Sequence, residues 1–215
     1  MRKNTLLITA GPTREYIDPV RFISNLSSGK LGYEIAEEFS KHNYNVILIS
    51  GPTNLKVSKK INLYNVETAD EMFKYVRKYF PICDVFISVA AVCDFKPVKV
   101  SKQKIKKKKE YIIKLVPTVD ILKYCGTIKK NRQILVGFAL ETDKRKALLY
   151  AEEKLKEKNL DLIILNSPDT FANDFIKPKF IYKDSKIENY KCLTKKRFAK
   201  ILYKIVTKLL NRAHE

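Results

Sequence analysis

The 215-residue chain has few of the residues on which several kinds of site depend. It contains two histidines and four cysteines, and no two cysteines form a CxxC pair. Zinc sites usually group four such ligands at short spacings, so a zinc site is not expected. A nucleophile activated by histidine, as in Ser–His or Cys–His sites, is not expected either, because there are only two histidines. Cysteines scattered without a disulfide framework indicate a reducing, cytoplasmic environment.

Long hydrophobic runs are also missing. A membrane-spanning helix needs about 18 consecutive apolar residues. The best run here, Val85–Cys93, is half as long and contains Ser88. The apolar stretch after Arg2 and Lys3 ends at Gly11-Pro12, which is too early for a secretory signal. We therefore expect no membrane partner.

The glycine-rich fingerprints of nucleotide-binding proteins are incomplete. Gly11-Pro12-Thr13 stands where a GxGxxG motif would begin, but the second and third glycines are missing. Ser27–Lys30 resembles the end of a P-loop, yet Ser24 and Leu31 occupy positions where the Walker spacing needs Gly and Ser or Thr. A glycine at a helix N-terminus can still offer backbone N–H groups to a phosphate. A plain N-cap at Ser28 is the competing interpretation.

Negative charge is scarce, because 23 Asp+Glu face 43 Lys+Arg for a net charge of +20. Only eight of these cations are arginines, the residue whose planar fork suits phosphate recognition. Lysine spread along the whole chain favours a compositional bias over a nucleic-acid partner, and a basic nucleic-acid-binding module is kept as an alternative. Six of the eight residues Lys102–Lys109 are lysine. This run could be a solvated loop, a polyanion site, or a loop with one functional lysine.

Strand-like and helix-like segments alternate along the chain. Apolar runs predict strands at residues 4–10, 45–50, 61–66, 84–91, 111–116, 134–139 and 161–165. Helical spacing predicts helices at residues 28–39, 69–80, 119–125, 144–158 and 194–211, the second opened by a Thr68/Glu71 capping box. This order predicts one α/β domain over residues 1–215, Rossmann-like, with a mainly parallel sheet and helices on both faces. A small β-hairpin at residues 180–190 and a long polar connection at residues 95–110 complete it.

Ligands of such sheets bind outside the carboxyl ends of the strands, so the segments after Ala10, Ala90, Ala139 and Leu165 are candidates. The connection from Gly11 to Gly29 is the most unusual of them. It has about 20 residues, whereas such connections normally have about 2–6. We therefore expect it to carry function.

The segment Ile8–Glu37 resembles the opening of the phosphopantothenate–cysteine ligases (phosphopantothenoylcysteine synthetases) of coenzyme A biosynthesis. Five further blocks follow in the family's order and at roughly its spacing: Ala90–Pro97, Lys104–Lys107, Asp120–Leu122, Gly137–Thr142 and Lys154–Asp161. Many bacteria fuse this domain to a flavin-dependent decarboxylase. Met1 here directly precedes the first strand, so the resemblance is to the stand-alone bacterial form, without flavin.

The resemblance implies a reaction in two steps. The family activates the carboxylate of 4′-phosphopantothenate with a nucleoside triphosphate, CTP in most bacteria, and releases pyrophosphate. The amine of cysteine then attacks the acyl-cytidylate and releases CMP. The resemblance further implies Mg²⁺ for the phosphates, with unknown metal ligands, and a homodimer to which Phe180–Tyr190 contributes. Use of ATP in place of CTP stays open.

The resemblance also implies roles for individual residues. Asn25 would hydrogen-bond the reacting acyl group, Lys104 would meet the α-phosphate or the developing negative charge, and Arg21 would act in the same loop as Asn25. Lys104 would also belong to the nucleotide site, together with Gly11, Ser28, Gly29, Ala91, Asp94, Asp120, Ile121, Leu122, Phe138, Lys154 and Lys158. Cys93 stands where the family has a small residue, and we assign it no catalytic role.

A second enzyme class shares the predicted fold. A Rossmann-type nicotinamide-dependent reductase would use a YxxxK pair, and Tyr150 and Lys154 have that spacing. The missing GxGxxG motif argues against this class. The ligase is therefore the preferred hypothesis.

Overall fold

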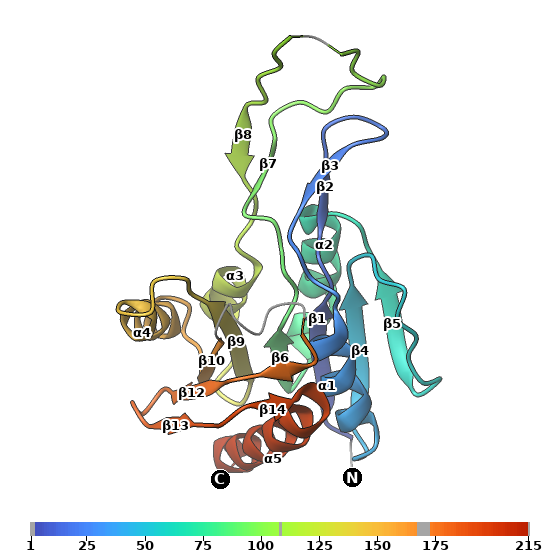
Figure 1. The fold of residues 1–215 in the computed structure, drawn as a ribbon. Coiled ribbons are helices and arrows are strands. Elements are labelled where there is room, and N and C mark those ends of the chain that lie inside the picture. The colour runs from blue at the N-terminus through green and yellow to red at the C-terminus, as the bar shows by residue number, and fades with distance from the viewer. Residues whose placement is uncertain (1–2, 108, 167–172, 215) are drawn as a thin grey trace.

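The computed structural model describes residues 3–107, 109–166 and 173–214. Its centre is an eight-stranded sheet in the order β13-β12-β10-β9-β6-β1-β4-β5 (Figure 1). Six strands are parallel: β1 (Thr5–Ala10), β4 (Asn45–Ser50), β5 (Ile61–Asn65), β6 (Val85–Ser88), β9 (Ile134–Leu140) and β10 (Leu162–Asn166). At one edge β12 (Lys179–Tyr182) and β13 (Ile187–Asn189) run antiparallel. The predicted parallel sheet and the hairpin at residues 180–190 are confirmed.

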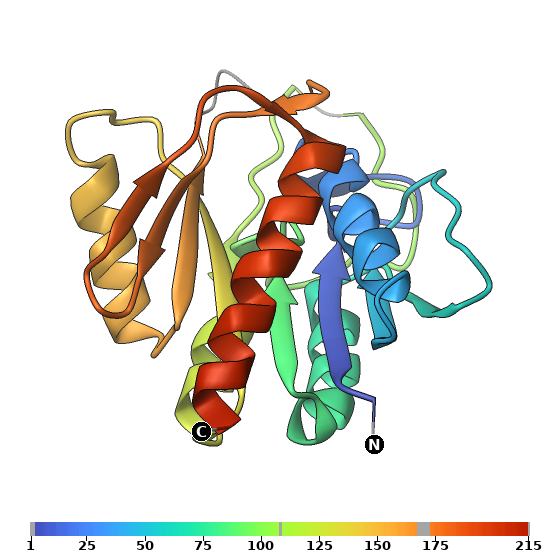
Figure 2. The same ribbon diagram turned by 90° about the horizontal axis from the view of Figure 1, so that it is seen from below.

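Helices cover both faces of this sheet (Figure 2). One face carries α1 (Lys30–Ser40) and α5 (Lys195–His214). The other carries α2 (Ala69–Tyr79), which continues into the short 3-10 helix η1 (Phe80–Ile82), and then α3 (Ile121–Ile128) and α4 (Ala147–Glu157). The two-sided arrangement predicted from the alternating segments is confirmed, with helix ends shifted by a few residues.

Burial on both faces explains the continuous apolar composition of the central strands. All six residues of β1 are buried. Leu6 and Ile8 belong to the core under α1 and α5, whereas Leu7 belongs to the core under α2, α3 and α4. A parallel strand covered by helices on both sides needs apolar side chains at successive positions, which is why it lacks polar alternation.

The two predicted helix starts have different outcomes. The Thr68/Glu71 capping box at α2 is confirmed. The N-cap of α1, however, is Gly29 and not Ser28, and no side chain caps the helix. Gly29 has φ 74°, and a Cβ there would lie 2.7 Å from Thr53 Cγ2. The left-handed backbone and the close contact both need glycine, so the alternative of a plain serine N-cap is wrong.

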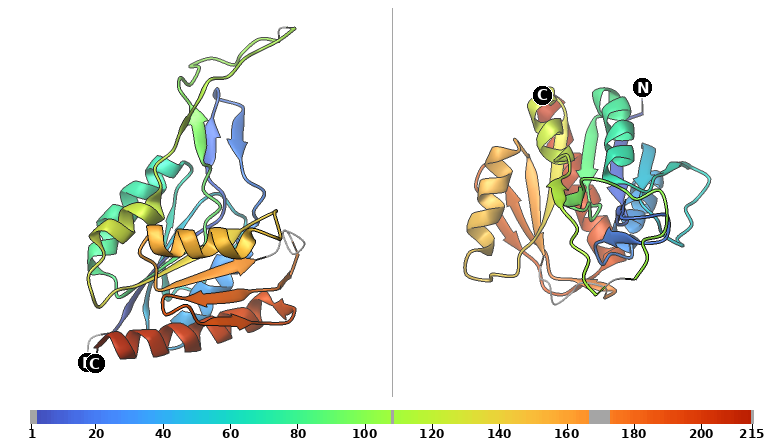
Figure 3. Two further views of the ribbon diagram at one scale, coloured as in Figure 1. Left: turned by 90° about the vertical axis from the view of Figure 1, so that its left-hand side faces the viewer. Right: turned by 90° about the horizontal axis from the view of Figure 1, so that it is seen from above.

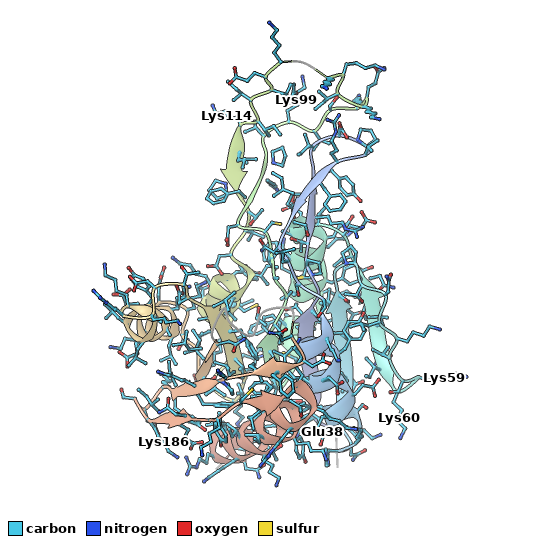
Figure 4. The ribbon with its side chains drawn as sticks, viewed as in Figure 1. Glu38, Lys59, Lys60, Lys99, Lys114 and Lys186 are labelled. Atoms are coloured by element: carbon cyan, nitrogen blue, oxygen red, sulfur yellow. The ribbon has the colours of Figure 1, made fainter. Side chains whose placement is uncertain are left out.

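Two hairpins project from the sheet beyond the carboxyl ends of its strands (Figures 1 and 3). The first pairs β2 (Arg14–Tyr16) with β3 (Phe22–Ser24) inside the long connection after β1. The second pairs β7 (Phe95–Pro97) with β8 (Leu115–Pro117), and its far loop includes Lys99 and Lys114 (Figure 4). We call residues 95–117 the flap. The strand predicted at residues 111–116 is wrong before Leu115, because the pairing with β7 covers Leu115–Pro117. The Val98 N–H extends this contact by one bond, to Lys114 O at 3.0 Å.

A smaller two-stranded sheet pairs β11 (Phe175–Ile176) with β14 (Leu193–Thr194), directly before α5. Sequence periodicity gave no sign of it. Cys83, Cys93 and Cys125 are buried, and Cys192, near β14, is exposed. Burial raises the pKa of each of the three buried thiols. Among the described residues, no helix is long and apolar enough to cross a bilayer.

Candidate active site

A pocket of about 840 Å³ lies at the carboxyl ends of the central strands. Its walls come from segments that are distant in sequence: residues 24–32, 88–92, 118–122 and 138–140, with Gly11, Asp94, Lys154, Lys158, Asn166, Phe175, Ile176 and Lys195. This is the sheet edge at which α/β folds bind ligands. The pocket therefore lies where the strand order predicted it.

Backbone contacts between the ends of β1 and β6 form the floor. The Ala91 N–H donates to Gly11 O at 2.9 Å, and the Thr13 N–H donates to Ala91 O at 3.3 Å. Gly11 has φ 72°, and a Cβ there would lie 2.9 Å from Gly51 O. Glycine is therefore required at Gly11, and the missing side chain lets the segment after β1 lie close to Gly51, which follows β4.

Asn25 links the β2–β3 hairpin to this floor. Its Nδ2 donates to Val92 O at 2.9 Å and to Ala91 O at 3.4 Å. The neighbouring Ser24 Oγ donates to Thr13 O at 2.8 Å. These bonds hold Asn25 at the pocket wall. Its amide hydrogens point to carbonyl oxygens here, so the predicted hydrogen bond to an acyl group stays a prediction.

Lys154 in α4 and Lys158, the residue that caps its C-terminus, reach the pocket, each beside a carboxylate. Lys158 Nζ lies 2.7 Å from Asp120 Oδ2, and Lys154 Nζ lies 2.6 Å from Glu141 Oε1. Burial raises the pKa of Asp120, but the hydrogen bonds from Lys158 and from the Lys123 N–H outweigh it, so the net pKa is lowered. Asp120 therefore stays ionised while it caps α3 and pairs with Lys158. An anionic ligand would face both lysines together with these carboxylates.

Twelve predicted site residues thus meet in one pocket: Gly11, Asn25, Ser28, Gly29, Ala91, Asp94, Asp120, Ile121, Leu122, Phe138, Lys154 and Lys158. Phe138 also packs edge-to-face on Phe198, with ring centroids 6.0 Å apart, so it belongs to both core and pocket. Their roles stay predictions, but their convergence does not follow from their positions in the sequence.

Arg21 and Lys104 do not line this pocket. Arg21 Nη2 lies 2.7 Å from Asp18 Oδ2 and donates to Ile105 O at 2.6 Å. The Ile105 N–H in turn donates to Asp18 Oδ2 at 3.1 Å. The loop of the flap is therefore tied to the tip of the β2–β3 hairpin, and Lys104 lies beside this tie, away from the pocket. Lys108 of the same lysine run lies outside the described residues.

Three charged residues at the pocket escaped the sequence-based prediction. Lys30 and Lys195 line it, and Lys30 Nζ pairs with Asp174 Oδ1 at 2.6 Å. Lys30 had a weak signal, because it ends the Ser27–Lys30 segment that resembles a P-loop. Asp174 and Lys195 had none, since only the β11–β14 pairing brings them together.

A resident metal centre is not evident in the described part of the chain, where no three His, Cys, Asp or Glu residues group as ligands. Magnesium that binds together with a nucleotide needs fewer protein ligands than a resident metal ion. It keeps several waters and takes one or two carboxylates together with the phosphates. Asp94 lines the pocket and has no ion pair among the described residues, so it fits that requirement.

Comparison with known proteins gives a consistent family match. The profile of the family described as DNA/pantothenate metabolism flavoprotein C-terminal domain matches residues 1–210. The Coenzyme A biosynthesis bifunctional protein CoaBC of Haemophilus influenzae is 49% identical over 160 residues, which are 74% of this chain and 40% of that protein. A prokaryotic protein of unknown source, named cysteine/cysteine sulfinic acid decarboxylase, is 41% identical over 97% of this chain and 58% of its own length. The chain spans about half the length of the curated relatives it matches.

Solved structures share the fold. A crystal structure of the C-terminal domain of a CoaBC protein is 40% identical and superposes with a TM-score of 0.84, covering 99% of this chain and 98% of that one. A Cab2 mutant in complex with phosphopantothenate-cysteine is 20% identical, with a TM-score of 0.77 and coverage of 98% and 86%. The second likeness shows a common fold only.

Proposed function

Because the chain belongs to the family described as DNA/pantothenate metabolism flavoprotein C-terminal domain, we propose that it joins 4′-phosphopantothenate to cysteine in coenzyme A biosynthesis. The relatives named CoaBC support the pathway. The complex of the distant fold relative with phosphopantothenate-cysteine agrees with this product. The observation that carries the proposal is that all the family-like blocks except Lys104–Lys107 contribute residues to one pocket, which has cationic side chains on its walls.

The proposed reaction transfers a nucleotidyl group and then an acyl group. A carboxylate oxygen of phosphopantothenate attacks the α-phosphorus of CTP, and the bond to the β-phosphate breaks to release pyrophosphate. The cysteine amine attacks the acyl carbon and loses a proton, and the acyl–oxygen bond to CMP breaks. Neither step is an oxidation or a reduction, so the proposal assigns no flavin to this chain. The choice of CTP rests on the sequence resemblance alone.

The protein's contribution would be to hold two anions together. Lys154 and Lys158 supply positive charge to the nucleotide, and the floor at Gly11 and Ala91 admits it closely. Asn25, fixed by the Val92 carbonyl, would position the acyl group at the wall. Bound magnesium would neutralise phosphate charge, with Asp94 as the available carboxylate. Holding both reactants in one pocket turns each step into an effectively intramolecular one.

The relative named as a decarboxylase does not change this proposal. That name describes a whole protein of which the chain covers 58%. A reaction on a free thiol compound with a nucleoside triphosphate suits the reducing cytoplasm, where we propose that the protein acts.

We also propose that the protein works as a homodimer joined through its two projecting hairpins. These carry exposed apolar side chains: Val20, Phe22, Phe95, Val98, Val100, Tyr111, Ile112 and Leu115. Exposed apolar side chains gathered on two neighbouring hairpins are typical of association sites. The segment expected from the sequence, Phe180–Tyr190, is less suited, because Phe180 and Ile181 are buried in their own core.

Pyrophosphate release tests the proposed reaction. Purified protein is given phosphopantothenate, cysteine and Mg²⁺ with CTP or ATP, and the ligated product is identified by its mass. We expect release that depends on phosphopantothenate and CTP. Asn25→Ala should lower the turnover about 10²–10³-fold, the cost of losing one positioned hydrogen-bonding group. Asn54→Ala, on an exposed position outside the pocket, should leave it unchanged.

Other outcomes have clear meanings. Equal or better release with ATP would retain the ligase and replace the nucleotide. No release with either nucleotide, from protein shown to be folded, would contradict the proposed function.

A further inference from the structure

Three charged residues form a cluster on one side of the pocket: Lys30 at the start of α1, Lys195 at the start of α5, and Asp174 before β11. Lys30 and Lys195 come from the helix layer opposite to α4, which supplies Lys154 and ends at the cap residue Lys158. The pocket therefore has lysines on walls from both faces of the sheet. Neither the sequence resemblance nor the proposed chemistry assigns a role to this cluster.

The pairing of β11 with β14 fixes the cluster. Phe175 pairs with Thr194, so the next residues outward, Asp174 and Lys195, become neighbours. The Lys195 N–H donates to Asp174 O at 3.0 Å. The side chain of Asp174 extends to α1, where its Oδ1 lies 2.6 Å from Lys30 Nζ. One carboxylate therefore stands among two ammonium groups.

The charges of the cluster are unevenly balanced. The hydrogen bond from Lys30 lowers the pKa of Asp174, and the same bond raises the pKa of Lys30. Burial lowers the pKa of Lys195, and the nearby Lys30 charge adds to this effect while Asp174 opposes it. The charge of Glu34, one turn along α1, also raises the pKa of Lys30. Within the three-residue cluster itself, two cations face one anion, so its own charge is positive.

The residues in the first turns of α1 and α5 also favour an anionic ligand. Acidic residues usually occupy the first turn of a helix, because its N-terminus carries a partial positive charge. Neither α1 nor α5 has an acidic residue there. Instead α1 begins with Lys30, and α5 begins with Lys195-Lys196-Arg197. Cations gathered at two positive helix ends are unfavourable unless an anion joins them.

Stability does not explain the ion pair. The Lys30 and Asp174 side chains are 40% and 68% exposed. Exposed pairs of this kind contribute little to folding, because water screens them and two flexible side chains must be ordered. A role in ligand binding at the pocket explains the pair better than a contribution to folding.

We propose that Lys30 and Lys195 bind the polyphosphate of the nucleotide substrate, and that Asp174 is an internal anion which the polyphosphate displaces from Lys30. The inference rests on the proposed function for the identity of the ligand. Phosphate oxygens would take the place of the Asp174 carboxylate beside Lys30 and would also meet the first-turn N–H groups of α1. The pyrophosphate product carries the same charges and should bind at the same place.

Isothermal titration of the full chain with inorganic pyrophosphate in magnesium buffer tests this directly. Lys30→Gln and Lys195→Gln should each weaken binding about tenfold, the usual cost of losing a hydrogen bond to a charged group. Lys196→Gln is the matched control, since Lys196 is exposed and lies outside the pocket lining, and it should bind like wild type. Lys195→Arg should restore binding, because it keeps the charge.

Asp174→Asn distinguishes displacement from a structural role. Removing the competing carboxylate should tighten pyrophosphate binding several-fold, whereas a residue that merely holds the wall in place would weaken it on substitution. Glu153→Gln, which removes an exposed carboxylate from α4 outside the pocket lining, controls for the change in net charge.

The inference is overturned if both glutamine variants bind pyrophosphate as Lys196→Gln does, or if Asp174→Asn weakens binding. Its failure can be separated from failure of the proposed function, because the titration contains neither phosphopantothenate nor cysteine. Lysine-dependent pyrophosphate binding without any ligation would contradict the ligase alone. Ligation with lysine-independent pyrophosphate binding would contradict this inference alone.

Discussion

Asp18 is the residue on which the arrangement of the two hairpins most depends. Its carboxylate accepts from the Val20 and Arg21 N–H groups, both at 2.8 Å, and from the Ile105 N–H at 3.1 Å. Its side chain has no exposed surface, although it sits in a slender hairpin. Burial raises its pKa, but these backbone hydrogen bonds and the Arg21 side chain outweigh it and lower the pKa to about 2.

Asp18→Asn should release the flap loop from the β2–β3 hairpin. An amide offers one carbonyl oxygen where the carboxylate offers two charged ones, so the bonds to Ile105 and Arg21 weaken together. Hydrogen exchange of peptides covering residues 99–107 should become several-fold faster. Asp184→Asn, in the β12–β13 turn, is the control. Unchanged exchange in Asp18→Asn would show that the tie is not what orders the loop.

The same tie has a defined pH dependence. The folded pKa of Asp18 lies below its ordinary value of 3.8, so the ionised carboxylate favours the folded state. Its contribution is complete above pH 3.8 and is lost as the pH falls through about 2. The loop should therefore stay tied in mildly acidic buffer.

For single residues, the sequence predicted which side chains belong to the site better than it predicted which residues they contact. Lys154 and Lys158 were placed on one helix face, and both reach the pocket. Lys104 and Arg21 were expected at the same site, but spacing cannot show that the flap and the β2–β3 hairpin hold them away from the pocket. Asp18 was not singled out, because its importance comes from the Ile105 N–H, far along the chain.

At the scale of elements, the contact of α1 with β1 sets the shape of the pocket. Gly32 faces Ala10, and a Cβ at Gly32 would lie 2.5 Å from the Ala10 Cβ. The helix whose first residues line the pocket therefore lies against the strand that ends at Gly11. Any side chain at Gly32 must push the two apart.

Gly32→Ala should destabilise the fold by about 1–3 kcal/mol, the usual cost of overpacking a well-filled contact. Urea unfolding followed by circular dichroism measures it. Glu34→Ala, on the partly exposed side of the same helix, should stay within about 0.5 kcal/mol of wild type. Ala forms helix better than Gly, so helix propensity alone would make Gly32→Ala stabilising. A neutral or stabilising effect of Gly32→Ala would therefore show that the contact with β1 does not limit the position.

Regular elements were predictable because periodic apolar residues identify them. β1, β4, β9 and the capping box of α2 each appear where the pattern predicted them. The β2–β3 hairpin was missed because its strands have three residues each, too few for a period. Residues 111–114 had strand composition but lie outside the β7–β8 pairing, and Ile112 is 82% exposed.

At the scale of the whole molecule, the place of Lys104 bears on the proposed homodimer. The bonds from Arg21 and Asp18 to Ile105 hold the flap loop away from its own pocket. The apolar surface of the hairpins offers a contact for a partner. A Lys104 that acts on the nucleotide would then serve the partner's pocket.

Mixing two inactive variants tests this arrangement. Asn25→Ala and Lys104→Ala should each be inactive alone, but mixed dimers would hold one complete site. Half of randomly paired dimers are mixed, so roughly a quarter of the wild-type turnover should return after mixing and exchange. No recovery, in a mixture shown to exchange subunits, would place Lys104 and Asn25 in the same subunit's site. This arrangement could not be predicted from the sequence, because the sequence does not show whether a loop contributes to its own subunit's pocket or to that of a partner.

The burial of three thiols has a further consequence for a protein that we propose handles free cysteine. Disulfide exchange proceeds through an accessible thiolate. Cys83, Cys93 and Cys125 are buried and have raised pKa values, so they are poor partners for cystine or for mixed disulfides with the substrate. Oxidative damage would instead reach Cys192 first, on the surface and away from the pocket lining. The buried thiols of the core are thereby protected from disulfide exchange with the proposed substrate.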